Sequence, residues 1–100
     1  MPNYNDRHEF LFLQARELID NIDMQIVELL AQRSICIASI AKIKQINNLA
    51  VRDGDRENII LDRVTKEPVG FYHANDVAKV FYAIFQAGIN QQLSCKMEGE

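Results

Sequence analysis

Four residues near the middle of the chain are spaced as one face of a helix and combine two cations with two apolar side chains. Arg33, Ile37, Ile40 and Lys44 follow one another at intervals of four, three and four residues, which aligns them in one stripe along a helix. We call this set the cationic stripe. Its two long cations, separated by about 16 Å along the axis over an apolar floor, suit a small anion with an apolar ring. Residues of these types are also common on ordinary helices, as solvated cations and core isoleucines.

Arg16 is a third candidate for binding an anion. It precedes Arg33 by 17 residues, which is about 26 Å along a helix. Arg16 could therefore reach the same small ligand only from an antiparallel helix of another chain. Taken alone, Arg16 is better explained as an arginine that faces solvent.

Carboxylates gather where a second helix is expected to begin. Asp53 and Glu57 lie four residues apart on either side of Arg56, with Asp55 between them. A carboxylate here could accept a hydrogen bond from a ligand hydroxyl. For any one of these carboxylates alone, complementing the positive end of the helix dipole is the more common role, and the spacing fits both interpretations.

A neutral amide closes the apolar stripe of a third expected helix. Phe81, Phe85, Gly88 and Gln92 share one helical face. The amide of Gln92 can donate to a ligand oxygen without titrating, although it could also be an exposed group near the end of a helix. Gly88 costs about 1 kcal/mol relative to alanine inside a helix, so close packing or room for a ligand is expected there.

The elements that must position these residues are all helices. Apolar residues recur at helical spacing over about residues 7–46, 54–66 and 74–94, and no proline lies between Pro2 and Pro68. The predicted class is therefore all-α, with a long, a short and a medium helix. The long helix far exceeds the average length and cannot bury its apolar face against so short a remainder. We expect it to pack against a partner chain.

Local signals set the ends of these helices. Asp6 followed by Glu9 resembles a capping box, and the acidic residues from Asp53 onward favour a second helix start. Pro68 and Gly70 mark the loop before the third helix.

The composition predicts one domain over residues 1–100 with a net charge of −3. A mildly acidic chain without a basic run argues against nucleic acid as a partner. Neither a signal peptide nor an apolar run long enough for a membrane span is visible. Cys36 and Cys95 form no C-x-x-C pair, so free thiols, a cytoplasmic location and no metal site are expected.

Read in order, the chain resembles a known family over about residues 10–93. The segments that carry the resemblance are Ala15-Arg16, Ile22-Asp23, Leu29-Leu30-Ala31-Gln32-Arg33, Ala41-Lys42-Ile43-Lys44, Val51-Arg52-Asp53-Gly54-Asp55-Arg56-Glu57 and Gln91-Gln92. The family is that of the all-helical, or type II, chorismate mutases. Its fold implies three helices per chain in an intertwined homodimer.

The resemblance also implies how a dicarboxylate substrate, chorismate, would be held. Arg33 and Lys44 of one chain, with Arg16 of the other, would bind its carboxylates. Lys44 and Gln92 would donate hydrogen bonds to its ether oxygen.

The remaining implied contacts surround the ring of the substrate. Asp53 or Glu57 would bind the ring hydroxyl, and Arg56 would support that loop. Apolar walls would come from Ile37, Ile40, Phe85 and Ile89. Gly88 stands where several family members carry a serine that assists in carboxylate binding, so it is the departure from the family pattern.

The implied reaction is the Claisen rearrangement of chorismate to prephenate in phenylalanine and tyrosine biosynthesis, without a cofactor, metal or covalent intermediate. Lys44, Gln92 and Arg33 are the expected catalytic residues. The related isochorismate-pyruvate lyases share the fold but generally differ in the segment that corresponds to residues 51–57. A non-catalytic helical dimer would not require these polar residues to converge.

Overall fold

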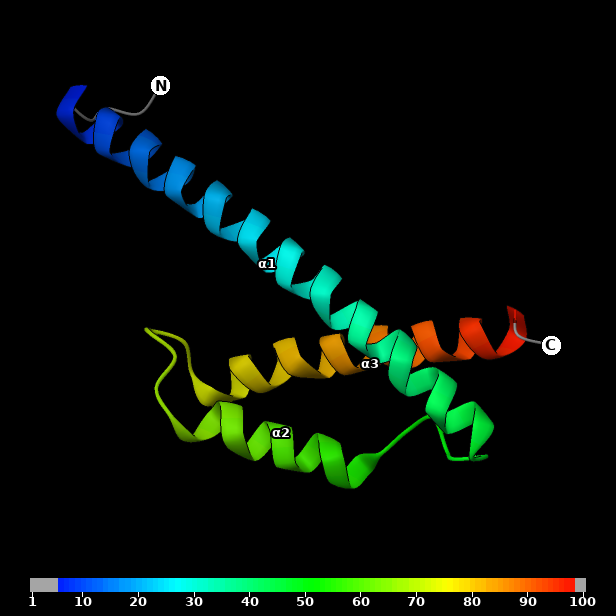
Figure 1. Cartoon of the computed structure of the whole chain (residues 1–100). Coiled ribbons are helices and arrows are strands. Elements are labelled where there is room, and N and C mark those ends of the chain that lie inside the picture. The colour runs from blue at the N-terminus through cyan, green and yellow to red at the C-terminus, as the bar shows by residue number, and fades with distance from the viewer. Residues whose placement is uncertain (1–5, 99–100) are drawn as a thin grey trace. The chain divides into compact units, whose positions relative to one another are not determined.

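The computed structural model describes residues 6–98, which form three α-helices. These are α1 (Asp6–Ile46), α2 (Gly54–Lys66) and α3 (Ala74–Glu98) (Figure 1). The predicted all-α class and the order long, short, medium are confirmed. The third helix continues to Glu98 rather than ending near residue 94, because no proline or glycine follows Gly88 before that point.

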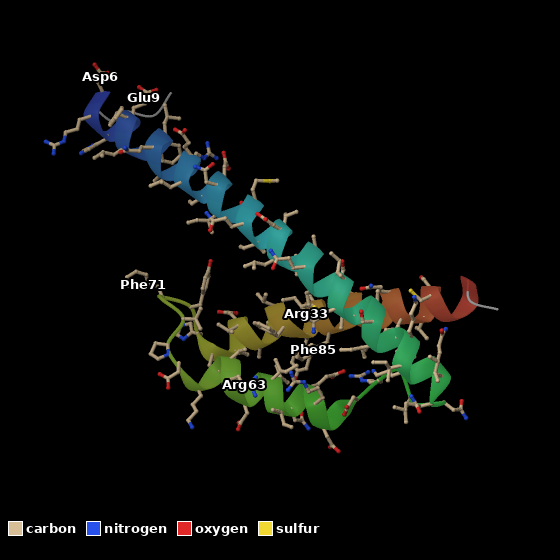
Figure 2. All side chains as sticks on the ribbon, in the orientation of Figure 1. Asp6, Glu9, Arg33, Arg63, Phe71 and Phe85 are labelled. Atoms are coloured by element: carbon tan, nitrogen blue, oxygen red, sulfur yellow. The ribbon has the colours of Figure 1, made fainter. Side chains whose placement is uncertain are left out.

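The contacts of the chain divide it into two units, with the boundary between Arg33 and Ser34. The first unit consists of α1 up to Arg33, and its first turn carries Asp6 and Glu9 (Figure 2). Every described residue of this unit except Glu9 and Arg33 is exposed. Large apolar side chains are included, such as Leu29 at 62% exposure. A helix gains most of its stability by packing an apolar face, and this unit does not bury one within itself.

The second unit contains the end of α1 together with α2 and α3. The helices α2 and α3 contact each other and run antiparallel (Figure 1). Among its described residues, the buried apolar side chains are Ala41 of α1 and Val77 and Phe85 of α3. The Phe85 ring packs edge-to-face against Phe81, with 6.2 Å between the ring centroids. This small core holds the residues that the sequence singles out on α2 and α3.

The segment between α1 and α2 is fixed by local hydrogen bonds at both ends. Asn48 has a positive φ of 55°, and the amide of Leu49 donates to the carbonyl of Lys44 at 2.8 Å. This geometry is a left-handed C-cap, which asparagine tolerates. At the other end, Asp53 is the N-cap of α2 and accepts from the backbone amide of Arg56 at 3.0 Å. The acidic helix start expected from the sequence is confirmed.

The loop between α2 and α3 reverses the chain through a tight turn. Gly70 has a φ of 57°, and the amide of Tyr72 donates to the carbonyl of Val69 at 3.1 Å. Phe71 projects from the tip of this loop and is fully exposed (Figure 2). Within residues 6–98, none of the helices has the length and apolarity needed to cross a membrane.

Candidate active site

Lys44 and Gln92 are neighbours in the second unit although they lie on different helices. The Nζ of Lys44 donates to the Oε1 of Gln92 at 3.1 Å. Gln92 is only 7% exposed, so the alternative of an exposed amide near a helix end is wrong. This bond orients the amide with its acceptor Oε1 toward Lys44, and the Nε2 group carries the N–H donors. Nε2 makes one long bond, 3.3 Å, to the carbonyl of Gly88, and an amide carries two N–H donors.

In the part of the chain that the structure describes, the half-buried Lys44 is held by two neutral groups. Besides Gln92, its Nζ donates to the backbone carbonyl of Val51 at 2.6 Å. Among residues 6–98, no carboxylate forms an ion pair with Lys44. An ammonium group has three donors, so one donor and the full positive charge remain available. The site therefore attracts an anionic ligand and can donate to it.

The two carboxylates at the start of α2 have different environments. Asp53 is exposed, and its Oδ1 is engaged in capping the helix. The Glu57 side chain is only 14% exposed and pairs with the Nη2 of Arg52 at 3.4 Å through one oxygen, Oε1. No partner of its second oxygen is found among the described residues. Glu57 therefore has an oxygen available to accept from a ligand.

Arg56 contributes to this turn through its backbone. Its N–H donates to Asp53, whereas its own side chain is exposed. The cap does not use the guanidinium, so a supporting role for that group stays a prediction.

The residues predicted to form the apolar walls differ in how deeply they are buried. Phe85 is buried, Ile37 and Ile89 are half-buried, and Ile40 is 43% exposed. Gly88 is buried one turn before Gln92 on α3. Phe85, Gly88 and Ile89 therefore lie on a face of α3 that turns toward the interior of the second unit, whereas the expected wall position Ile40 is exposed.

The two predicted arginines of α1 belong to the first unit. Arg33 is half-buried and pairs with no carboxylate in the described part of the chain. Arg16 is exposed and lies 4.9 Å from the centroid of the Phe12 ring. About 26 Å of helix separates the two arginines, so one chain cannot bring both to one small ligand. In the same described residues, no cluster of three His, Cys, Asp or Glu could hold a metal ion.

Comparison with known proteins identifies the family. The family model described as chorismate mutase type II matches residues 15–93. This chain belongs to the type II chorismate mutase family. The resemblance drawn from its sequence motifs is thereby confirmed.

Curated relatives carry the same family name. The chain is 34% identical over 93 residues to a bifunctional chorismate mutase/prephenate dehydratase of Buchnera aphidicola from Schizaphis graminum, and the match covers 92% of this chain but 23% of that protein. A chorismate mutase of Methanocaldococcus jannaschii is 36% identical over 53 residues, covering 53% of this chain and 54% of that protein. The chain thus spans only part of the length of these relatives.

A solved structure supports the fold. The form II chorismate mutase of Thermus thermophilus superposes with a TM-score of 0.78 at 25% identity, covering 81% of this chain and 92% of that chain. The all-helical fold is therefore shared with a chorismate mutase.

Two contacts of the site were not expected from the sequence. The carbonyl of Val51 that accepts from Lys44 is a backbone group, which every residue has. The residue type at position 51 therefore could not predict this hydrogen bond. The pairing of Arg52 with Glu57 crosses the start of a helix, where spacing rules for helical side chains do not apply.

Proposed function

We propose that this chain is a chorismate mutase, an isomerase that converts chorismate to prephenate in the shikimate pathway toward phenylalanine and tyrosine. The observation that carries the proposal is the hydrogen-bonded pair of Lys44 and Gln92. The ammonium of Lys44 and the amide of Gln92 supply two hydrogen-bond donors at one place. The curated relatives of the chain are named as chorismate mutases.

The reaction needs only such positioned donors. One ether C–O bond breaks and one C–C bond forms within the same molecule, so no proton, electron or co-reactant is exchanged. The free N–H groups of Lys44 and Gln92 would stabilise the charge that develops on the ether oxygen. Ile37, Phe85 and Ile89 would hold the enolpyruvyl group over the ring, which is the near-attack geometry.

For the ring hydroxyl, we favour Glu57 over Asp53 as the acceptor. Asp53 already uses an oxygen to cap α2 and is exposed, whereas the less exposed Glu57 retains an oxygen without a partner among the described residues. The helix-capping and ligand-binding interpretations of this acidic cluster then apply to different residues.

We further propose that two chains form a homodimer and share each site. Arg33 and Lys44 of one chain and Arg16 of the second would bind the two carboxylates of chorismate. Support comes from the exposed apolar residues of the first unit and from the length of helix between Arg16 and Arg33. Burial of this apolar surface would supply the driving force for association.

A cytoplasmic location fits the two cysteines. Cys36 and Cys95 are both free, and free thiols are typical of a reducing compartment.

The decisive experiment presents the purified protein with chorismate and, in parallel, with isochorismate. We expect chorismate absorbance to fall and prephenate to accumulate, identified by its acid conversion to phenylpyruvate. No turnover at millimolar chorismate would refute the proposal. Release of pyruvate from isochorismate at a higher kcat/KM would assign the chain to lyase chemistry instead.

A further inference from the structure

Arg52 is the exposed member of the ion pair that reaches Glu57. Its side chain is 67% exposed, against 14% for Glu57. The backbone immediately before it is fixed, because the carbonyl of Val51 accepts from Lys44 at 2.6 Å. The residue immediately after it, Asp53, caps α2. Arg52 therefore projects from a segment that is anchored on both sides.

We propose that Arg52 is a positioning residue for substrate binding, acting through Glu57. This inference rests on the proposed function. Arg52 engages Oε1 of Glu57 and so leaves the second oxygen to accept from the ring hydroxyl of the substrate.

The charge of Arg52 has a second effect on a dicarboxylate ligand. An unpaired Glu57 would repel the two carboxylates of chorismate, and a cation at 3.4 Å offsets that repulsion. Both effects act on binding of the substrate rather than on the bond that breaks. Loss of Arg52 should therefore raise KM and leave kcat nearly unchanged.

The test compares Arg52→Gln and Arg52→Lys with the wild-type protein. Arg52→Gln should raise KM for chorismate about two- to fivefold, the range of an exposed ion pair, with kcat within about twofold of wild type. Arg52→Lys keeps the charge and should restore most of the affinity. The increase should shrink in 0.5 M salt, because salt screens exposed charges over about 4 Å at that concentration.

Lys79→Gln is the matched control. Lys79 also forms an exposed ion pair, with Asp76 at 3.9 Å on α3, and its loss should not change KM. In a Glu57→Gln background, Arg52→Gln should add no further increase, because its target charge is gone.

Three results would overturn the role of Arg52. These are a KM for Arg52→Gln equal to that of the Lys79 control, a fall in kcat without a change in KM, and an effect that persists in the Glu57→Gln background. Each leaves the proposed function intact, because the wild-type protein would still consume chorismate. A wild-type protein that does not consume chorismate would overturn both proposals.

Discussion

At the scale of single residues, the central feature is a lysine that pairs with no carboxylate among the described residues. Lys44 is bonded to a carbonyl and to an amide, and neither acceptor cancels its charge. Its neighbour Gln92 is buried, and the Nε2 donor group of Gln92 is not used in the bond to Lys44. The pair thus combines electrostatic attraction with directed hydrogen bonding.

Lys44→Ala should lower kcat/KM about a hundred- to a thousandfold, the usual cost of removing one preorganised donor. Lys42→Ala is the matched control, since Lys42 is an exposed cation on the same helix, and its activity should match wild type. Steady-state kinetics on both variants check this, with circular dichroism to verify folding. Equal activity of the two variants would show that Lys44 lies on an ordinary helix surface.

The residue types of the site were predictable, but their partners were only partly so. Helical spacing placed Lys44 on the cationic stripe and Gln92 on an apolar face, and the structure brings these two together. Spacing alone left Asp53 and Glu57 equivalent. Their difference arises from the helix boundary: Asp53 falls at the N-cap, where its oxygen meets a backbone amide, and Glu57 falls one turn inside.

At the scale of elements, the caps decide where the functional residues fall. Proline and glycine placement and the acidic start of α2 predicted its bounds, because each signal has a local backbone cause. The predicted end of α3 is too early, since no proline or glycine lies between Gly88 and Glu98. The hydrogen bond from the Lys44 side chain to the carbonyl of Val51 could not be predicted. It depends on the path of the segment that connects α1 and α2.

The N-cap of α2 can be tested through Asp53. Asp53→Ala should lower the free energy of unfolding by about 1 kcal/mol, because the amide of Arg56 loses its acceptor. Asp53→Asn retains a capping oxygen and should cost much less. Urea unfolding at one fixed protein concentration measures both. Equal losses in the two variants would indicate that the charge of Asp53, rather than its capping geometry, stabilises α2.

Two glycines should respond in opposite directions to the same substitution. Gly70 has a φ of 57°, so Gly70→Ala should destabilise the fold by about 1 kcal/mol. Gly54 begins α2 with no atom within 4 Å of an added Cβ, so Gly54→Ala should stabilise by about 0.4–1 kcal/mol. Thermal unfolding of both variants under identical conditions provides the comparison. Shifts of the same sign would contradict the backbone assignment at one of these positions.

At the scale of the whole molecule, α1 is the feature that points to a partner chain. The first unit exposes large apolar residues along the helix, and it carries two arginines too far apart for one small ligand. The unusual helix length was evident from the sequence and led directly to the proposal of a partner. Helix length alone does not identify that partner, because the partner's own surface decides which chain fits.

Mixing two inactive variants tests whether sites are shared. In a homodimer that shares sites, Arg16→Ala and Arg33→Ala chains combine so that a mixed dimer contains one intact site. With random exchange of equal amounts, about a quarter of wild-type activity should return. Native mass spectrometry would verify the exchange. Exchange without any recovery would exclude a site that takes Arg16 and Arg33 from different chains.

The exposed apolar face of α1 also makes protein concentration a variable of catalysis. In the proposed dimer, chorismate binds only the associated state, so binding and association are thermodynamically linked. Substrate would then lower the dissociation constant of the dimer, and dilution would weaken apparent substrate affinity by the reciprocal effect. Below that dissociation constant, total activity should rise more steeply than in proportion to the amount of protein. Substrate would thus act as an assembly factor for its own enzyme.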